Sequence, residues 1–262
     1  MKNFIIRLIA CFIANKDARH TFRNKYKKET IKDRIHDLER KIASFNQKQK
    51  TIQVNGKNNH IYIDGKEINI DDNINGLTIR IKGNNNIIEI FTPYIFINTV
   101  IEIGNDNCHI KIGKNPTISN TYIRLAYGSN QHVFIGDNFT FRGNEIICDE
   151  NSGITIGNDC IFSSYIIIRP SDGHSVIDDN TKEVVNQCNK NMIIGDRCWL
   201  GARIILTKNA GLSNDTIVAA GSVVTKFFKE EKVIIAGNPA KIVKRGYIYH
   251  HTNPMYYNSG NI

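Results

Sequence analysis

The chain has 262 residues, of which 41% are hydrophobic and 23% are charged, and its formal net charge is +9. This composition supports a packed core and excludes wholesale disorder, because disordered chains combine few apolar residues with high charge. The charge is unevenly placed: residues 1–50 hold 14 Lys and Arg against 5 Asp and Glu, so the first fifth carries all of the net charge. No recognisable nucleic-acid-binding module accompanies this basic segment, which argues against a nucleic-acid partner.

The first predicted element is a basic amphipathic helix near the amino terminus. Its apolar residues recur at the spacing of one helix face, and they are Phe4, Ile5, Leu8, Ile9, Phe12 and Ile13. Arg7 interrupts the run, which is too short to span a bilayer, and no small-residue cleavage site of a secretory signal follows. The pattern favours a helix that lies on the anionic inner face of the cytoplasmic membrane. The alternative is a helix packed on the protein's own body.

A second helix is predicted to follow, and the two together form a unit over residues 1–50. Its apolar residues are spaced by 4, 3, 4 and 3, as in a coiled coil, and they are Ile31, Ile35, Leu38, Ile42 and Phe45. Two heptads are too few to be stable alone. We therefore expect either a short coiled coil between copies of the chain or a helix packed on its own subunit.

From Thr51 the periodicity changes to a repeat in which Ile or Val is followed by Gly, Asn or Asp. Successive copies of this motif begin at Val54, Ile81, Ile103, Ile135 and Ile156. The intervals between these starts are uneven, and the longest runs from Ile103 to Ile135. This unevenness predicts early coils that are irregular or carry loops.

Between Met192 and Lys226 the repeat becomes regular, with an aliphatic residue at every sixth position. These residues are Ile194, Leu200, Leu206, Leu212, Val218 and Val224. Six is an even number, so an extended chain presents the same face at each repeat, whereas a helix would not. Interspersed Gly, Asn and Asp supply the corners, since they tolerate positive φ. Stacked repeats predict one continuous solenoid over residues 51–246.

Three ordered stretches of this region resemble a known family. Residues 194–202, 219–226 and 236–241 are similar to the hexapeptide-repeat acyltransferases, and in particular to bacterial capsular polysaccharide and sugar O-acetyltransferases. The resemblance implies a mainly β fold, a left-handed parallel β-helix carrying amino-terminal α-helices. It also implies a homotrimer and acetyl-CoA as co-substrate.

Residues 170–191 form a polar loop that interrupts the repeat, and loops on a rigid scaffold often carry functional sites. This loop contains His174. Together with Trp199, the one tryptophan of the chain, it resembles the catalytic His and the thioester-side Trp of those enzymes. A neutral imidazole can take the proton of a sugar hydroxyl as the oxygen attacks a thioester, without an acyl-enzyme. Asp172 is a candidate for orienting His174 and for contacting the acceptor.

The resemblance implies further site residues. Asn144 corresponds to an acceptor-binding Asn, although the turn after it is one residue longer here. The implied donor contacts are Trp199, Gly201, Ala202, Ala220, Thr225, Lys226 and Lys241. The backbone N–H of Gly201 or Ala202 is the candidate donor to the developing oxyanion. Lys244 and Arg245 are either phosphate contacts or solvated surface residues.

Neither a metal site nor a covalent mechanism is expected. His109, His132 and His174 lack the close grouping of a zinc site. The six cysteines include no Cys-x-x-Cys pair, which favours reduced thiols in the cytoplasm. Cys160 and Cys198 each follow an aliphatic repeat position by four residues and are predicted to be core residues, not nucleophiles.

The sequence as a whole predicts an acetyl-CoA-dependent O-acetyltransferase acting on a hydroxyl of a bacterial surface polysaccharide, from a capsule or lipopolysaccharide. It is expected to be cytoplasmic and peripheral on the inner membrane. Three alternatives stay open: an N-acetyltransferase of an amino-sugar nucleotide, a xenobiotic acetyltransferase, and a non-catalytic solenoid scaffold. The tail at residues 247–262 matches no pattern that we recognise.

Overall fold

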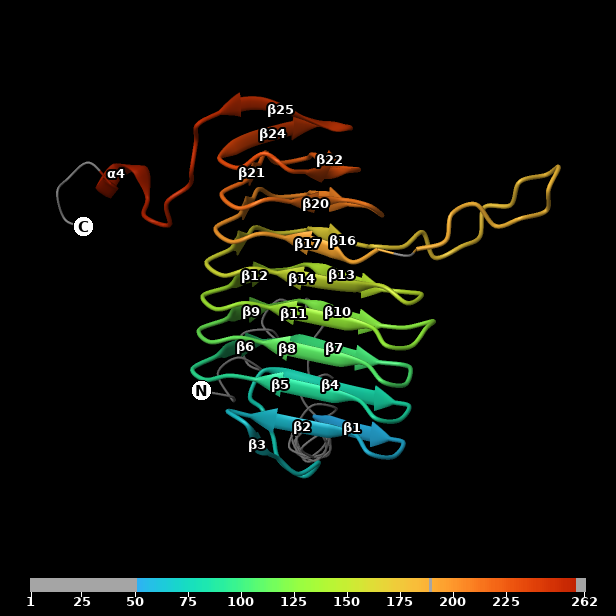
Figure 1. Cartoon of the computed structure of the whole chain (residues 1–262). Helices are drawn as coiled ribbons and strands as arrows, with labels where there is room; N and C mark the ends of the chain where they lie inside the picture. The colour runs from blue at the N-terminus through green and yellow to red at the C-terminus, as the bar shows by residue number, and fades with distance from the viewer. Residues whose placement is uncertain (1–50, 189, 258–262) are drawn as a thin grey trace, which may run out of the picture. The chain divides into compact units, whose positions relative to one another are not determined.

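A computed structural model describes residues 51–188 and 190–257, so both predicted amino-terminal helices lie outside the described residues. The described chain winds into a three-sided solenoid whose faces are three β-sheets (Figure 1). Strands three places apart in the chain pair side by side in parallel, because each turn of the solenoid adds one strand to each sheet. Among the described residues, no helix has the length and apolar character needed to cross a membrane.

We name the sheets A, B and C in the order in which the chain visits them. Sheet A consists of β1 (Ile52–Asn55), β4 (Leu77–Lys82), β7 (Thr99–Ile103), β10 (Tyr122–Leu125), β13 (Glu145–Cys148), β16 (Ile167–Ile168), β19 (Ile205–Leu206) and β22 (Val223–Val224). Sheet B consists of β2 (His60–Ile63), β3 (Lys66–Glu67), β5 (Ile87–Ile90), β8 (His109–Ile112), β11 (His132–Ile135), β14 (Gly153–Ile156), β17 (Met192–Ile194), β20 (Gly211–Leu212) and β23 (Phe227–Phe228).

Sheet C completes the prism. It consists of β6 (Ile95–Ile97), β9 (Thr117–Ser119), β12 (Thr140–Arg142), β15 (Ile161–Phe162), β18 (Trp199–Leu200), β21 (Ile217–Val218), β24 (Val233–Gly237) and β25 (Ala240–Arg245). β25 pairs antiparallel with β24 and ends the solenoid, and the short helix α4 (Pro254–Tyr257) follows. The three edges where the chain turns between sheets are called the A–B, B–C and C–A edges below.

The six-residue repeat forms the inner ladder, as predicted. Ile194, Leu200 and Leu206 lie on sheets B, C and A in turn, and each is at most 1% exposed. One repeat therefore spans one face, and three repeats close one coil, because Leu200 pairs with Val218 three repeats further along the chain. This aliphatic column is the core of the described chain.

The early coils are longer than three repeats, and the first of them is irregular, as predicted: Val54 pairs with Ile81, and the chain between them forms the extra strand β3, which pairs antiparallel with β2. Ile81 pairs with Ile103 and Ile103 pairs with Leu125, so the next two coils are equal in length. The long predicted step from Ile103 to Ile135 is wrong as a coil length, because Ile103 lies on sheet A and Ile135 on sheet B. The extra residues of the early coils widen sheets A and B, whose parallel strands are longer there than in the later coils.

Columns of residues with positive φ mark the edges. Asn58, Asn85 and Asn107 stack at the A–B edge, with φ between 55° and 57°. Their side-chain amides form a ladder, in which each Nδ2 donates to the next Oδ1 at 3.1 and 3.2 Å. Asn tolerates this left-handed conformation better than most residues, so the predicted role of Asn as a corner residue is confirmed.

Candidate active site

The long interruption predicted at residues 170–191 leaves the solenoid at the A–B edge, between β16 and β17. It projects as an extended excursion to the right of the solenoid in Figure 1. Its two arms meet through a bridge between Ile177 and Val184. His174 lies near the root of this excursion and is exposed. The candidate general base, His174, is therefore exposed to solvent at the A–B edge.

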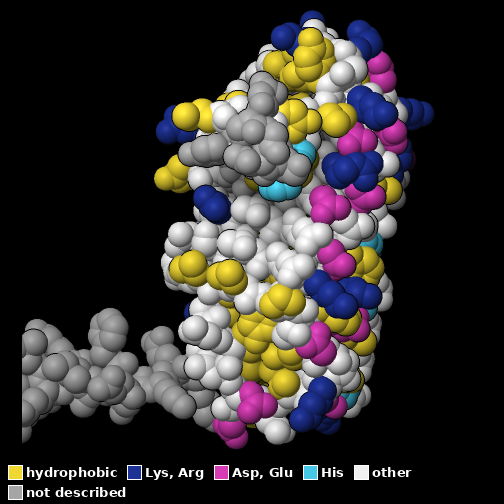
Figure 2. All heavy atoms as spheres, turned by 90° about the vertical axis from the view of Figure 1, so that its left-hand side faces the viewer, with side chains coloured by type: hydrophobic (Ala, Val, Ile, Leu, Met, Phe, Trp, Pro, Cys, Tyr) yellow, Lys and Arg dark blue, Asp and Glu magenta, His cyan; other side chains and the backbone are white. Residues whose placement is uncertain are grey.

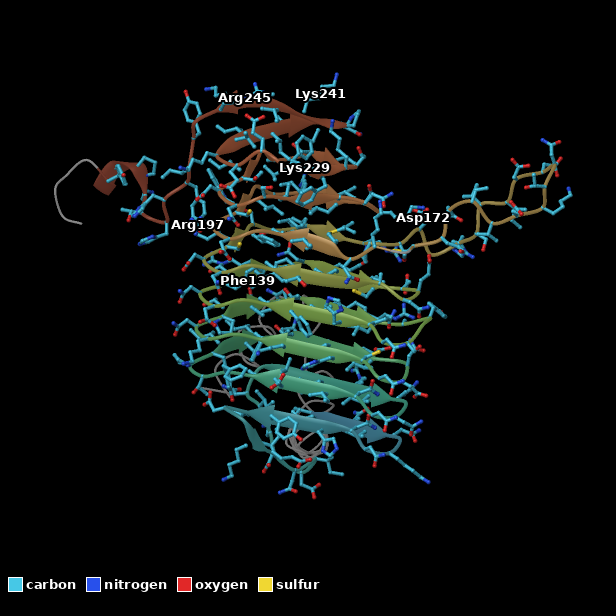
Figure 3. All side chains as sticks on the ribbon, viewed as in Figure 1. Phe139, Asp172, Arg197, Lys229, Lys241 and Arg245 are labelled. Carbon is cyan, nitrogen blue, oxygen red and sulfur yellow. The ribbon has the colours of Figure 1, made fainter. Side chains whose placement is uncertain are left out.

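A polar cluster ties the root of the loop to the next coil. The ammonium group of Lys208 donates to Asp172 Oδ2 and, at 2.9 Å, to the carbonyl oxygen of Asn186. Asn186 Nδ2 donates to Asp172 Oδ2 at 2.9 Å and to the His174 carbonyl oxygen at 2.8 Å. The hydrogen bond from Lys208 holds the pKa of Asp172 below its ordinary value. Asp172, labelled in Figure 3, thus anchors the backbone that carries His174.

Directly beneath this root lies a group that the sequence analysis missed. Asp149 follows β13 at the same edge and is 4% exposed. Arg169 Nη2 lies 3.5 Å from Asp149 Oδ2, while Asp149 Oδ1 and Ser171 Oγ are buried without a hydrogen-bond partner. Burial raises the pKa of Asp149, against the opposing effect of Arg169. Buried polar atoms are rarely left unpaired, so these two point to a polar ligand at the loop root.

The signal for Asp149 in the sequence is weak. It is an acidic residue that directly follows the buried strand residue Cys148, but many solenoid corners carry Asp. Burial and the missing partner appear only in three dimensions.

The C–A edge carries a second set of predicted site residues. Asn144 lies at this edge between β12 and β13, and it is 6% exposed. Its Oδ1 accepts the N–H of Ile166 at 2.6 Å, whereas its Nδ2 is buried without a partner. It borders an open hollow of about 700 Å³, whose lining includes Ser164 and Tyr165.

In the later coils the C–A edge carries small residues, so few side-chain atoms project from it. Gly201 and Ala202 follow β18 there, and Ala220 follows β21 in the next coil. The coils stack so closely that a Cβ on Gly201 would lie 2.7 Å from the Ala220 nitrogen. The Gly201 N–H donates to the Val218 carbonyl oxygen at 2.9 Å, so it is not free to donate a hydrogen bond to an oxyanion. Of the two N–H groups considered, Ala202 remains the candidate.

Trp199 stands on the outer face of sheet C, in register with Ile161 below it and Ile217 above it. Its side chain is 43% exposed. The A–B edge lies opposite sheet C in the three-sided prism, so one chain holds His174 and Trp199 on different sides. The structure therefore does not bring the two predicted catalytic residues together within one chain.

The remaining donor candidates gather at the carboxyl-terminal end of the solenoid. Thr225 and Lys226 follow β22 at the A–B edge, and Lys241 lies on β25. Lys226 and Lys241 line one hollow of about 380 Å³ together with Lys229. Figure 3 shows Lys229 and Lys241 at this end of the molecule. Three ammonium groups around one hollow suit a phosphate-bearing ligand.

The two further basic residues at this end have partners on the protein. Arg245 Nε lies 2.7 Å from Glu230 Oε1, and Lys244 Nζ lies 5.3 Å from the centre of the Tyr247 ring.

The prediction that Cys160 and Cys198 are core residues is confirmed. Cys160 and Cys198 are both 0% exposed, and they adjoin in successive coils, with the Cys198 N–H 3.4 Å from Cys160 Sγ. The Cys198 side chain and burial together raise the pKa of the Cys160 thiol, which suits a core residue and not a nucleophile. Within residues 51–188 and 190–257, no three His, Cys, Asp or Glu side chains are grouped as metal ligands would be.

Comparisons with known proteins agree with this architecture. The chain is 32% identical over 189 residues to a polysialic acid O-acetyltransferase of Neisseria meningitidis, and the match covers 64% of this chain and 87% of that protein. It is also 32% identical over 146 residues to a polysialic acid O-acetyltransferase of Escherichia coli O1:K1 / APEC, covering 55% of this chain. The match spans 46% of the length of that second relative. No family model matches the chain.

A solved structure gives the fold. The crystal structure of the polySia-specific acetyltransferase NeuO superposes with a TM-score of 0.59 and 24% identity, covering 78% of this chain and 89% of that one. The predicted left-handed parallel β-helix is thereby confirmed. The fold and the edges described above define a hexapeptide-repeat solenoid. The chain belongs to the hexapeptide-repeat acyltransferase family, among relatives named as sugar O-acetyltransferases.

Proposed function

We propose that this protein is an acetyl-CoA-dependent O-acetyltransferase that acetylates a hydroxyl of a bacterial surface polysaccharide. The observation that carries the proposal is the division of the site between two edges. His174, Thr225 and Lys226 lie at the A–B edge, whereas Asn144, Gly201 and Ala220 lie at the C–A edge, beside Trp199. Each chain holds two half-sites, and a complete site forms where the A–B edge of one subunit meets the C–A edge of another. This arrangement supports a cyclic homotrimer.

In this site His174 is the general base. Its exposed imidazole takes the proton from the acceptor hydroxyl while the oxygen attacks the thioester carbonyl, and the thiolate of coenzyme A is the leaving group. The bond between oxygen and the acetyl carbon forms first, which places negative charge on the carbonyl oxygen; the carbon–sulfur bond then breaks as that charge returns, and the imidazolium gives its proton to the thiolate. Asp172 contributes indirectly, since it is hydrogen-bonded to Lys208 and Asn186 and so fixes the His174 backbone.

Donor binding uses both edges. Lys226 and Lys241 meet the phosphates of coenzyme A at the end of the solenoid, and the low C–A edge at Gly201 and Ala220 admits the pantetheine arm. The Ala202 N–H, at the same edge, is the proposed donor to the carbonyl oxygen as it gains negative charge.

The acceptor is held at the loop root. Asp149 Oδ1 and Ser171 Oγ are buried and unpaired at the root of the loop that carries His174, and sugar hydroxyls are the proposed partners for them. An exposed guanidinium group adds a basic rim, since Arg169 is 44% exposed in its side chain. The names of the relatives, polysialic acid and galactoside O-acetyltransferases, support a glycan acceptor. Contact of residues 1–25 with the inner membrane stays a prediction, because those residues lie outside the described part.

The experiment is acetyl transfer to a panel of bacterial capsule oligosaccharides, with mass analysis of the products. Once an acceptor is found, His174→Ala should lower kcat by about 10² to 10⁴-fold, because general base catalysis supplies a factor of that size. Acetyl-CoA affinity should stay within about twofold, since the imidazole acts on the acceptor hydroxyl. His109→Ala, a histidine on sheet B, is the matched control. A kcat of His174→Ala equal to that of the wild type would refute the assigned base.

A further inference from the structure

The outer face of sheet C carries a short apolar stripe in the later coils. Ile161, Trp199 and Ile217 are adjacent in register on β15, β18 and β21. In the two preceding coils the equivalent positions on sheet C are the polar Thr140 and Thr117, and in the coil before those it is Ile95. The stripe therefore starts at β15, after two polar positions, and includes the predicted donor-site tryptophan.

The carboxyl-terminal segment, residues 247–257, crosses this stripe. The Tyr249 ring lies 6.4 Å from the Trp199 ring between centroids, at an interplanar angle of 50°. The Tyr249 hydroxyl donates to the backbone carbonyl of Asp159 on the solenoid. Burial raises the pKa of this hydroxyl to about 12, so it stays protonated and keeps its donor role at neutral pH. Two independent contacts thus seat the segment on sheet C.

The segment is also held together internally. The Met255 N–H donates to Asn253 Oδ1 at 3.0 Å, which caps the start of α4. The His250 and Tyr257 rings meet edge to face with centroids 5.1 Å apart. These contacts give residues 250–257 a defined shape of their own.

Between the segment and the stripe lies a hollow of about 650 Å³. Its floor is formed by Ile161, Trp199 and Ile217, and its wall by residues 248–254 and Tyr257. Figure 2 faces this side of the molecule and shows hydrophobic side chains and histidines gathered about the described end of the chain. An apolar hollow with a few polar groups at its wall has the character of a small-ligand site.

We propose that this hollow receives the acyl-pantetheine arm of the donor, and that Tyr249 positions the arm against Trp199. The inference rests on the proposed function and adds the carboxyl-terminal segment to its donor site. Trp199 is the shared residue: its indole forms the floor of the hollow, and Gly201 and Ala202 follow it onto the low C–A edge. An arm that runs along that edge and reaches Trp199 passes directly into the hollow. The mostly apolar lining suits the alkyl parts of the arm, and His250 and Asn253 offer polar atoms to its amides.

The test compares two ligands that differ by the arm. Acetyl-CoA contains it, whereas 3′-phosphoadenosine 5′-diphosphate is the complete nucleotide part without it. Tyr249→Ala should weaken acetyl-CoA binding by about tenfold, the loss expected for a buried aromatic contact, and leave 3′-phosphoadenosine 5′-diphosphate binding unchanged. Titration calorimetry measures both. Trp199, the one tryptophan of the chain, gives a second readout, because its fluorescence should change when acetyl-CoA occupies the hollow.

Controls separate positioning from folding. Tyr62→Ala, the same substitution on sheet B, should bind both ligands like the wild type. Tyr249→Phe keeps the ring but loses the hydrogen bond to Asp159, so its acetyl-CoA affinity should lie between those of the wild type and Tyr249→Ala. A chain ending at Tyr247, which keeps β25 intact, should show the same selective loss as Tyr249→Ala. In steady-state assays of Tyr249→Ala the KM for acetyl-CoA should rise about tenfold while kcat changes little.

Several results would overturn the proposal. The first is an acetyl-CoA affinity that is unchanged in both Tyr249→Ala and the truncated chain. The second is that Tyr249→Ala weakens the binding of both ligands equally. The third is that the Trp199 fluorescence of the wild type does not change when acetyl-CoA is added. The proposed function fails differently: a wild type that binds acetyl-CoA through this hollow but acetylates no glycan would leave the inference standing and remove the assigned reaction.

Discussion

Asp149 shows how little of a buried charge is visible in the sequence. Asp is common at solenoid corners, and Asp106 and Asp137 at other corners simply accept backbone N–H groups at 2.7 Å. Asp149 instead leaves one oxygen unpaired beside Ser171, which is also unpaired. The difference depends on which side chains the loop root buries, and no local pattern determines that. By contrast, the buried position of Cys198 was predictable, because the six-residue period fixes which face each side chain takes.

Close stacking at the A–B edge gives a prediction at the scale of one residue. An added Cβ on Gly128 would lie 2.0 Å from the Glu150 carbonyl oxygen, a backbone atom that cannot turn aside. Gly128→Ala should therefore destabilise the fold by about 1 to 3 kcal/mol, the range for overpacking. Thermal denaturation measures the change. Gly104→Ala is the matched control at the same edge, because its Cβ would meet nothing closer than the Leu125 carbonyl oxygen at 3.5 Å. Equal melting temperatures of the two variants would contradict the stacking argument.

At the scale of the element, the loop at residues 170–191 is rooted by side chains and not by strand pairing. Asn186 donates to both Asp172 and the His174 carbonyl, and Lys208 from the next coil donates to Asp172 and Asn186. The sequence indicated the loop, since the six-residue spacing stops and resumes. It did not indicate Lys208 as its anchor, because that contact joins residues 36 positions apart.

Removing the anchor should loosen the loop and leave the solenoid folded. Lys208→Met keeps the aliphatic stem of the side chain and removes the two donated hydrogen bonds. We expect faster limited proteolysis within residues 176–185, an unchanged melting temperature within a few degrees, and a lower kcat. Lys182→Met removes an exposed ion pair with Asp179 in the same loop and serves as the control. Proteolysis of Lys208→Met at the wild-type rate would show that the root is held in another way.

The pH dependence of the same anchor follows from Asp172. Its pKa in the folded protein is lowered, chiefly by Lys208, so the contact contributes fully above the ordinary aspartate pKa of about 4. The contribution is lost as the pH falls through the lower, folded value. The wild-type loop should therefore become more sensitive to an acid-stable protease such as pepsin only below about pH 4. Lys208→Met should not show that added sensitivity. A transition well above pH 4 would show that a group other than Asp172 controls the root.

For the whole molecule, the sheet or edge on which each residue falls decides which predicted site residues lie close together. The six-residue ladder predicted the solenoid, but Ile103 and Ile135 are not equivalent positions of successive coils, because they lie on different sheets. For the same reason the sequence did not show that His174 and Trp199 are far apart. Their separation depends on the edge or sheet to which each residue belongs, and the repeat spacing alone does not give that. Once the sheets are known, the residues divide between the A–B edge and the C–A edge with sheet C, except at the carboxyl-terminal end, where Lys241 of sheet C shares a hollow with Lys226.

This division makes a prediction about assembly. If each site joins the A–B edge of one subunit to the C–A edge of the next, His174→Ala and Trp199→Ala damage different halves of it. Each variant alone should be nearly inactive. Unfolded together, mixed in equal amounts and refolded, they should regain activity, because some junctions pair the intact His174 of one subunit with the intact Trp199 of its neighbour. Random assembly of a cyclic trimer gives about one junction in four of this kind, so roughly a quarter of wild-type activity is expected.

The measurement is acetyl transfer by the refolded mixture, with light scattering to confirm an assembly of three chains of 29.7 kDa each. Refolded wild type sets the full scale, and each variant refolded alone sets the background. Mixing His174→Ala with a Lys226→Ala variant is the sharper control. Both substitutions fall at the A–B edge, so every A–B edge in that mixture lacks one of the two residues, and activity stays at about half the residual level of Lys226→Ala. If mixing His174→Ala with Trp199→Ala restores activity and mixing it with Lys226→Ala does not, the two halves of the site belong to neighbouring subunits. No restoration in an assembled trimer would place the whole site within one chain, and the loop carrying His174 would then have to fold back across the solenoid to reach sheet C.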